Sequence, residues 1–423
     1  MTDILGGTVL DPESGKTGAF DLRIADGVIQ EIAAAGTLPE AQTDVIDASG
    51  KIVTAGLVDI HVHFRDPGFT HKEDILTGAE AAKRGGYTSV VMMGNTKPHP
   101  DNLETLRYML EKGGQTGIHV YPCANVTMGM EGKQLTEMEA LAAAGAVLFT
   151  DDGLPVTDED IMREACKRAA ALGKMISLHE EDHAYVKESG VNAGPVAQEL
   201  GLTGASREAE YRMVERDIAI ARETGCALDV QHVSCKESVA LIRAARAEGL
   251  PVHAEATPHH FSLTEDAVRR YGTLAKVNPP IRTEEDRLAI IEGLKDGTIE
   301  MIATDHAPHA EEEKALPFVQ APSGMTGLEN ALSLGLRELV KPGHLSLLQL
   351  LRCMSTNPAR IAGLPGGCVK EGAPADLLIF DPEAERTADR GVSRSSNTPF
   401  TGQAMPGVIQ TVICKGKTVY GLV

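Results

Sequence analysis

The chain has 423 residues, enough for two or three domains of ordinary size or for one large α/β barrel with a small additional domain. Its formal charge of -20 argues against a protein built to hold nucleic acid or an anionic membrane, although a few local cations would still allow an anionic substrate. A hydrophobic share of 42% with 24% charged residues is ordinary for a globular protein and argues against intrinsic disorder.

The sequence predicts a cytoplasmic protein with reduced thiols. The longest apolar stretch, residues 140–149, is too short to span a bilayer, and residues 1–4 lack the basic start of a signal peptide. The seven cysteines are scattered and form no C-x-x-C pair, which argues against a disulfide framework and a structural zinc knuckle. We expect each cysteine to be a small buried side chain.

Residues 1–54 at the start and residues 365–423 at the end of the chain are predicted to be β-rich. Alternating runs of apolar and polar residues surround an Asp26-Gly27 turn and a Lys415-Gly416 turn, which is the pattern of a β-hairpin. A further strand is expected at residues 375–381. Because neither end can bury a core alone, we expect the two ends to pack together as one small β-sandwich.

The middle of the chain, residues 55–364, alternates short apolar runs with longer amphipathic stretches. The predicted strands are 57–63, 88–95, 118–124, 146–150, 175–179, 227–232, 251–255 and 299–304. The predicted helices are 72–84, 102–112, 158–172, 207–223, 236–248 and 284–295. Eight strand-then-helix units predict an α/β fold of the (β/α)8 TIM-barrel type, with a doubly wound sheet as the alternative.

Polar residues recur where these predicted strands end. In a barrel the carboxyl ends of the strands converge on one rim, where barrel enzymes carry their active sites. One shared site is therefore the simplest explanation of the pattern. The residues concerned are His61, His63, Asn95, Asp151, Asp152, His179, His232, Glu255 and Asp305.

His61 and His63 are spaced to bind one cation. Two positions apart on a strand, they face the same side, and neutral imidazole is a common zinc ligand. His179 and His232 are candidates for a second metal, with Asp152 bridging the two ions. Asp305 is expected to be a terminal ligand, a base, or both.

Two metals close together lower the pKa of a bridging water from about 15.7 toward neutrality. The resulting hydroxide can attack a carbonyl, and an adjacent carboxylate can pass its proton to a leaving nitrogen. The pattern of residues therefore predicts metal-assisted hydrolysis of an amide-like bond.

Two segments resemble the signatures of the dihydroorotase family within the amidohydrolase superfamily. Residues 59–68 read D-I-H-V-H-F-R-D-P-G, and residues 303–309 read A-T-D-H-A-P-H, with Lys314 following. Further similar blocks are residues 95–96, 149–153, 257–260, 278–282 and 327–329, in the order in which the family has them. The resemblance covers nearly the whole chain.

The residue expected to bridge the metals distinguishes the chain from relatives on the same scaffold. Hydantoinases, allantoinases and the short dihydroorotases carry a carboxylated lysine on strand four, whereas this chain has F-T-D-D-G at residues 149–153, as in the long, class I bacterial dihydroorotases. The resemblance implies that Asp152 is the ligand, with Asp151 as the alternative. All positions expected to bind metal are present, which argues against the inactive relatives that have lost ligands.

The resemblance also implies a set of substrate contacts. Arg65 is expected to pair with the substrate carboxylate, with His63 projecting toward the same rim. The main chain of Ser323 and Gly324 is expected to face a pyrimidine ring, although many relatives have Phe in place of Ser323. The remaining expected contacts are Asn95, Asn278 and His309.

The resulting hypothesis is a zinc-dependent dihydroorotase with two zinc ions per subunit. It would interconvert N-carbamoyl-L-aspartate and (S)-dihydroorotate in pyrimidine synthesis, with Asp305 as the general acid and base. The alternatives are a hydantoinase or allantoinase and, from another class of function, a non-catalytic partner of aspartate carbamoyltransferase. The resemblance implies a homodimer and allows association with that transferase in addition to activity.

Overall fold

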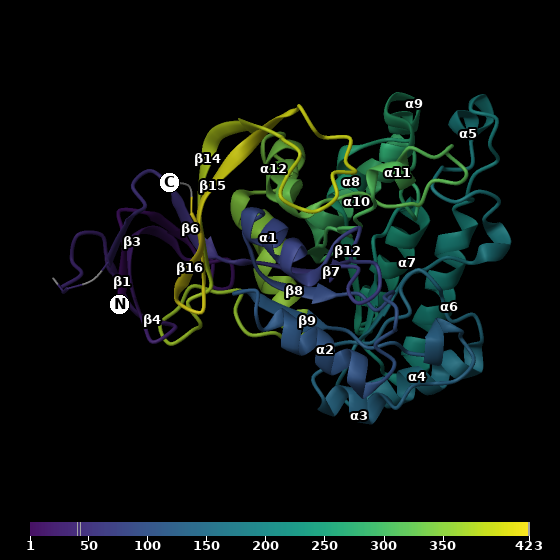
Figure 1. The fold of residues 1–423 in the computed structure, drawn as a ribbon, viewed down its shortest axis with the longest axis horizontal. Helices are drawn as coiled ribbons and strands as arrows, with labels where there is room; N and C mark the ends of the chain where they lie inside the picture. Colours follow the sequence, from purple (N-terminus) through teal and green to yellow (C-terminus); the bar gives the residue numbers. More distant parts are fainter. Residues whose placement is uncertain (40, 43, 422–423) are drawn as a thin grey trace.

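The computed structural model describes residues 1–39, 41–42 and 44–421. A β-rich part built from both chain ends lies beside a larger part in which strands are surrounded by helices (Figure 1). Of the described helices, none is long and apolar enough to cross a membrane.

The two chain ends form one hydrogen-bonded sheet, nine-stranded within the described residues. They join where β6 pairs antiparallel with β14. Strand β3 pairs with β2 through its first residues and with β1 and β4 through its last, so the two halves of the sheet share it. The strands are β1 Thr2–Leu5, β2 Thr8–Leu10, β3 Thr17–Ala25, β4 Val28–Ala34, β5 Asp44–Asp47, β6 Ile52–Ala55, β14 Leu377–Thr387, β15 Ala404–Cys414 and β16 Lys417–Gly421.

The core of this β-rich part draws on both ends of the chain. Its buried side chains include Ile4 and Leu22 from the first strands and Ile379 and Ile413 from the last. The predicted sandwich of the two chain ends is consistent with this arrangement. Both predicted hairpins are present, and their turn residues have the positive φ angles that tight two-residue turns require: 52° and 80° at Asp26-Gly27, and 53° and 72° at Lys415-Gly416.

The predicted barrel is confirmed, with a fourth strand shorter than expected. The parallel strands are β7 Leu57–Val62, β8 Tyr87–Met92, β9 His119–Pro122, β10 Ile176–Leu178, β11 Leu228–Val230, β12 Val252–Ala256 and β13 Met301–Ile302. In place of a strand at 146–150, Phe149 makes single parallel bridges to Ala124 and to Ile176. A parallel bridge between Val62 and His306 joins the first strand to the chain beyond the last.

The fourth strand stops at Phe149 because beyond it side-chain hydrogen bonds take the place of backbone pairing between strands. The carboxylate of Asp151 accepts hydrogen bonds from the backbone N–H groups of Val126 and Thr127, and Asn125 donates to the carbonyl of Thr150. These bonds hold residues 125–127 and 150–151 together where regular strand pairing stops. The next residue, Asp152, lines the pocket at the rim of the barrel.

All six predicted helices are present, and several of them begin at a polar side chain that caps the first turn. Asn102 caps α2, Asp158 caps α4, and Thr283 with Asp286 forms a capping box at α10. The helices are α1 Ile75–Arg84, α2 Leu103–Gly113, α4 Glu159–Ala171, α6 Glu208–Thr224, α7 Lys236–Ala247 and α10 Glu284–Asp296. Shorter helices are α3 Met138–Ala143, α5 Pro195–Glu199, α8 Pro258–Ser262, α9 Asp266–Tyr271, α11 Glu311–Lys314, α12 Ala331–Gly335, α13 Leu347–Leu351 and α14 Asn357–Ile361.

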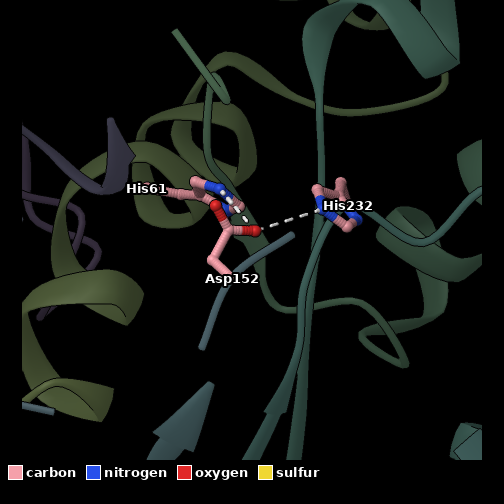
Figure 2. Close-up of side chains that lie close together, drawn as sticks. All are labelled: His61, Asp152 and His232. Carbon is pink, nitrogen blue, oxygen red and sulfur yellow. Dashed lines mark ion pairs between the residues drawn. The ribbon is translucent and has the colours of Figure 1, made fainter. Parts of the chain in front are cut away.

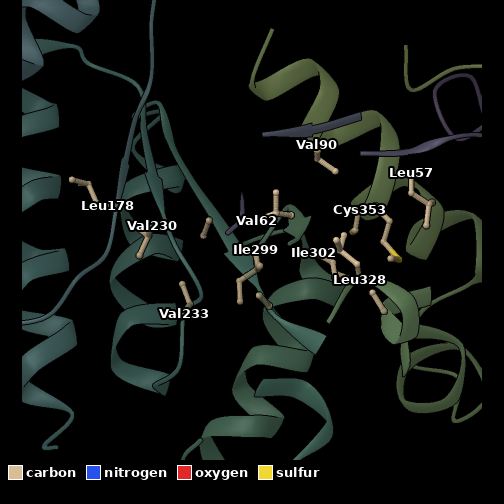
Figure 3. Close-up of a cluster of buried hydrophobic side chains, with 14 of the residues drawn as sticks. Leu57, Val62, Val90, Leu178, Val230, Val233, Ile299, Ile302, Leu328 and Cys353 are labelled. Atoms are coloured by element: carbon tan, nitrogen blue, oxygen red, sulfur yellow. The ribbon is translucent and has the colours of Figure 1, made fainter. Parts of the chain in front are cut away.

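Aliphatic side chains fill the space between the barrel strands and the helices. Figure 3 shows Val62 and Val90 from the first strands, Val230 from β11 and Ile302 from β13 within one buried cluster. Burial of apolar area at roughly 25 cal/mol per Å² is the main favourable term for such a core. It fixes the strands, so the side chains at their carboxyl ends are held by a rigid base.

The first and last barrel strands are also held together by a buried carboxylate. Asp59, fully buried on β7, accepts hydrogen bonds from the backbone N–H of His61 and from both the N–H and the hydroxyl of Thr304. Two of these bonds cross from β7 to the chain after β13. Asp59 therefore fixes the two segments, after the first and the last strand of the barrel, that carry the predicted ligands His61, His63 and Asp305.

We predict that Asp59→Ala destabilises the fold by about 3 kcal/mol or more, because three buried donors lose their acceptor. Asp59→Asn should cost less, since the amide oxygen still accepts. The measurement is the urea midpoint of unfolding, with Asp160→Ala on the exposed face of α4 as the control. Equal midpoints for the Asp59 and Asp160 variants would contradict the proposed role of Asp59.

Candidate active site

The predicted site residues come together in one pocket at the carboxyl ends of the barrel strands. The cavity measures about 180 Å³, and every predicted metal or substrate residue except His61 lines it. His61 lies just beneath, 1% exposed, and Figure 2 shows it beside Asp152 and opposite His232. The lining residues are His63, Arg65, Asn95, Asp152, Gly153, His179, His232, Asn278, Asp305, Ala307, His309, Ser323 and Gly324.

The first histidine pair has its outer ring nitrogens fixed by hydrogen bonds. Nδ1 of His61 donates to Oε1 of Glu255 at 2.6 Å, and Nδ1 of His63 donates to Oδ1 of Asn95 at 2.9 Å. These bonds leave Nε2 of both rings facing inward, where a bound cation would take the place of its proton. Nε2 of His61 is buried and has no hydrogen-bond partner among the described residues.

Asp305 faces the same two rings from the opposite side. Its Oδ1 lies 2.9 Å from Nε2 of His63 and 3.6 Å from Nε2 of His61. The backbone of Asp305 has a φ angle of 45°, a conformation that costs a non-glycine residue energy and is concentrated at functional sites. His61, His63 and Asp305 offer three donor atoms that all lie within 4.8 Å of one another.

The second histidine pair comes from β10 and β11. Nδ1 of His179 and Nε2 of His232 lie 2.9 Å apart and face the carboxylate of Asp152 at 3.6 and 4.0 Å. The other nitrogen of His179 lies 3.4 Å from Oε2 of Glu181. Glu181 accepts a second bond from Asn278 at 2.8 Å, which fixes its orientation.

Asp152 lies between the two histidine pairs, and Asp151 does not. The Asp152 carboxylate is 3.7 Å from Nε2 of His61 and 3.4 Å from Nε2 of His63, in addition to its contacts with the second pair. The Asp151 carboxylate faces away and accepts from Val126 and Thr127. Of the two adjacent carboxylates, the structure therefore brings only Asp152 among the predicted ligands.

The pocket combines buried acids with imidazoles that compete for protons. Burial raises the pKa of Asp152, but the neighbouring His61 and His179 outweigh it and hold that pKa well below its usual range. Burial lowers the pKa of His179, yet Asp152 and Glu181 raise it to about 10. Burial and the two nearby rings lower the pKa of His232. The site is thus built to hold positive charge next to ionised carboxylates.

This donor set fits a divalent metal. Imidazole nitrogens and carboxylate oxygens are typical zinc ligands, and the outer nitrogens of His61, His63 and His179 are fixed by other residues. The unpartnered Nε2 of His61 is explained if it binds a cation. His61, Asp152 and His232 form a second group of donors within 4.8 Å, so the cluster contains two overlapping groups of residues with the spacing to hold a metal ion.

Beside the cluster of histidines and aspartates, the pocket is lined by Arg65 and His309, which are suited to binding an anion. The half-buried guanidinium of Arg65 has no carboxylate within 4.0 Å among the described residues; its Nε donates to the carbonyl of Pro308 at 3.3 Å. His309 lies 3.3 Å from Nη2 of Arg65 and donates from Nε2 to the carbonyl of Ser323 at 2.8 Å. Burial, Arg65 and Lys72 lower the pKa of His309 to about 2, so its ring is neutral.

The structure also shows what the other predicted substrate residues do. Asn95 holds His63 and donates to Asp152 at 3.2 Å, so it positions ligands while lining the pocket. The amide oxygen of Asn278 has no partner among the described residues and is available to a ligand N–H group. The hydroxyl of Ser323 lies 3.3 Å from that of Ser189, so its main chain, and not its side chain, contacts His309.

Sequence reasoning missed the role of Glu181 and gave Glu255 no partner. Glu181 follows His179 by two residues, so its side chain returns to the same side as the histidine that it contacts. That spacing is a signal available in the sequence. The pairing of Glu255 with His61 joins residues 194 positions apart, and it depends on how the barrel closes.

We predict that Asp152→Ala lowers bound metal per chain, with one ion lost more readily than the other, because His61 and His63 still have Asp305 nearby. Asp151→Asn is the matched control and should keep the wild-type metal content, since that side chain faces away from the cluster. The measurement is metal content at a fixed free zinc concentration. Full retention of metal by Asp152→Ala would exclude Asp152 as a ligand.

Comparison with known proteins gives a consistent result. A family model described as dihydro-orotase-like matches residues 50–238. A protein from Clostridioides difficile named dihydroorotase is 50% identical over 420 residues, which cover 99% of this chain and 100% of that protein. Proteins of the same name from Clostridium acetobutylicum and Streptococcus pyogenes are each 48% identical and cover 99% of this chain.

Solved structures with the same fold include an L-hydantoinase (dihydropyrimidinase) from Arthrobacter aurescens, with a TM-score of 0.89 and 26% identity, covering 100% of this chain and 97% of that one. A D-hydantoinase from a Bacillus species has a TM-score of 0.87 and 26% identity, covering 100% and 95%. The barrel is thus shared with cyclic amidohydrolases. The full-length identity of 48–50% to its sequence relatives is decisive, and the chain belongs to the dihydroorotase family.

Proposed function

We propose that this chain is a metal-dependent cyclic amidohydrolase that interconverts N-carbamoyl-L-aspartate and (S)-dihydroorotate. The observation that carries the proposal is the guanidinium of Arg65, which lines the same pocket as the metal-ligand cluster and has no carboxylate partner among the described residues. A cation placed beside a hydrolytic centre selects a substrate that carries its own negative charge. Dihydroorotate carries such a charge on its ring carboxylate.

Arg65 and His309 together form the proposed carboxylate subsite. A guanidinium pairs with a carboxylate through two parallel hydrogen bonds, in a geometry that lysine does not reproduce. Neutral His309 contributes a ring N–H, which now donates to the carbonyl of Ser323. The free amide oxygen of Asn278 is placed to accept from a ring N–H of the substrate.

The residues proposed to hold metal are His61, His63, Asp152, His179, His232 and Asp305, and we propose zinc, with two ions per subunit. A divalent metal bound there would polarise the scissile carbonyl and lower the pKa of a water molecule. The protein's own part is to keep the rings oriented through Glu255, Asn95 and Glu181.

Asp305 is the proposed general acid and base. Burial raises its pKa, but the hydrogen bond from His63 and the neighbouring imidazoles outweigh burial and lower that pKa overall, so the carboxylate is ionised and can accept a proton. In ring opening, Asp305 takes the proton of the attacking water and passes it to the departing ring nitrogen. In ring closure, it first accepts a proton from the carbamoyl nitrogen.

The second candidate function is hydantoin or dihydropyrimidine hydrolysis, favoured by the structural neighbours that share the barrel. Two features of this chain count against it. Asp152 occupies the strand-four position where the resemblance places a carboxylated lysine in hydantoinases, and Arg65 faces the pocket with no carboxylate within 4.0 Å among the described residues.

We further propose a homodimer in the cytoplasm, able to associate with aspartate carbamoyltransferase, with units at residues 1–54, 55–364 and 365–423. The seven cysteines support a reducing compartment, because each is a buried free thiol. The continuous sheet that joins β6 to β14 supports treating the two end segments as one unit.

We predict that Asp305→Asn lowers turnover of dihydroorotate by about 10²–10⁴-fold, because the amide cannot accept the proton of the attacking water. The variant should keep its fold and most of its metal, since five other ligands remain. The check is kcat together with metal content, with Asp266→Asn on the exposed part of α9 as the control. Turnover within about threefold of wild type would exclude the assigned role.

The experiment that tests the proposed function compares substrates with and without a carboxylate. Arg65→Met should lower kcat/KM for dihydroorotate, and the ratio to wild type should correspond to a loss of about 2–5 kcal/mol of transition-state stabilisation. The metal content should be unchanged. Activity toward dihydrouracil, which lacks the carboxylate, should change far less. The matched control is Arg269→Met, which removes an arginine paired with Glu199 on the surface.

Equal losses on both substrates would mean that Arg65 supports the architecture of the pocket and that other residues bind the carboxylate. A wild-type chain that hydrolyses hydantoin or dihydrouracil better than dihydroorotate would favour the second candidate function.

A further inference from the structure

A 16-residue segment from the C-terminal end of the chain reaches the rim of the barrel. Residues 388–403, here called the rim strap, connect β14 to β15 and contain no strand or helix. In Figure 1 the corresponding yellow loop extends from the β-rich part toward α8 and α11. Irregular connections of this length inside compact domains are uncommon and are often functional.

The first half of the rim strap is fixed to the chain that follows β7. The hydroxyl of Ser393 and the backbone N–H of Arg394 both donate to the carboxylate of Glu73, and the hydroxyl of Ser395 donates to the carbonyl of Lys72 at 2.7 Å. Ser393 and Ser395 are both buried. The strap is therefore a packed element at this end and not a free loop.

Asn397, 4% exposed, binds the pocket wall through every hydrogen-bonding position of its amide. Oδ1 accepts from the backbone N–H of His309 at 3.0 Å. The two hydrogens of Nδ2 go to the carbonyls of Ala307 and Gly324, each at 3.0 Å. The backbone carbonyl of Asn397 also accepts from the N–H of Thr326 at 3.0 Å.

These partners belong to the two segments that carry the carboxylate subsite. Ala307, His309 and Gly324 all line the pocket, and the chain between the two segments is the connection that contains α11. A Cβ atom at Gly324 would lie 2.8 Å from that of Ala307 and 3.0 Å from Nε2 of His309, so the two segments are in close contact. A small shift of either segment would therefore move the ring of His309 relative to Arg65.

We propose that Asn397 is a positioning residue of the substrate subsite: its amide joins residues 307–309 to Gly324 and thereby sets where His309 meets the substrate carboxylate. This inference rests on the proposed function for the identity of the ligand. Asparagine suits this role because its amide group carries an acceptor oxygen and two donor hydrogens. An ionised aspartate has the same shape but no hydrogen to donate. The distant C-terminal segment thus completes the pocket of the barrel.

The test uses the full-length, metal-loaded chain and two substitutions. Asn397→Ala removes all three side-chain bonds, and Asn397→Asp keeps the shape but turns an oxygen toward two carbonyl oxygens. Both should raise KM for dihydroorotate about tenfold or more and leave kcat within about threefold, because the amide acts on binding and not on the reacting bond. Thr398→Val is the matched control, since this neighbouring buried hydroxyl accepts only a 3.5 Å bond from Phe400 among the described residues.

A second readout does not depend on the substrate. Amide hydrogen exchange at His309 should become faster in Asn397→Ala, which removes the acceptor of this N–H, and stay as in wild type in Thr398→Val. If the wild-type chain fails to turn over dihydroorotate, the proposed function is wrong, and the exchange rates alone decide the role of Asn397.

The outcomes that overturn the proposal are specific. A wild-type KM in a folded Asn397→Asp would show that the two donated bonds do not position the subsite. A loss of kcat at unchanged KM would place Asn397 with the reacting groups instead. Unchanged exchange at His309 in a folded Asn397→Ala would show that Asn397 does not hold that segment. If Asn397→Ala does not fold, the isosteric Asn397→Asp carries the test.

Discussion

Hydrogen bonds to the outer ring nitrogens orient three of the four imidazoles that meet two carboxylates in one small site. Nδ1 of His61 is bonded to Glu255 at 2.6 Å, and Nδ1 of His63 is bonded to Asn95 at 2.9 Å. Nε2 of His179 is bonded to Glu181. Each bond leaves the opposite nitrogen facing the cluster, where a bound cation would meet it. The donor set, the proposed metals and the chemistry at Asp305 all depend on these outer contacts.

The pocket separates its two kinds of charge. On one wall, ionised Asp152 and Asp305 face imidazoles and attract cations. On the other wall, Arg65 has no carboxylate within 4.0 Å in the described part of the chain and lies beside His309, whose pKa is too low for its ring to be protonated. A substrate with a carboxylate at one end and an amide-like bond at the other can bridge the two walls. This polarity is the physical basis for preferring an acidic ring over a neutral one.

The two chain ends contribute more than a supporting domain. They form one sheet through the pairing of β6 with β14, and between β14 and β15 the chain leaves that sheet and reaches the rim of the barrel. There Asn397 satisfies main-chain groups of both segments that line the proposed carboxylate subsite. Hydrogen bonds therefore join the loop between two strands of the β-rich part to the wall of the barrel pocket, although the two are far apart in the sequence.

The sequence by itself determined the local features, because they follow from short-range geometry. A two-residue spacing places His61 and His63 on one side of a strand, and Asp26-Gly27 accepts the positive φ angles of a tight turn. Alternating strands and helices predicted the barrel, and with it the rim at which the ligands meet. The resemblance to dihydroorotases supplied the substrate-side residues.

Only the tertiary structure decided between Asp151 and Asp152, because both lie in the same loop and the choice depends on the bonds that Val126 and Thr127 make. In place of the predicted fourth strand at residues 146–150, the structure has single bridges at Phe149. The contacts of Glu255 with His61 and of Asn397 with His309 join residues 194 and 88 positions apart. No local period encodes such pairs, since they form only when the barrel closes and the C-terminal segment packs against its rim.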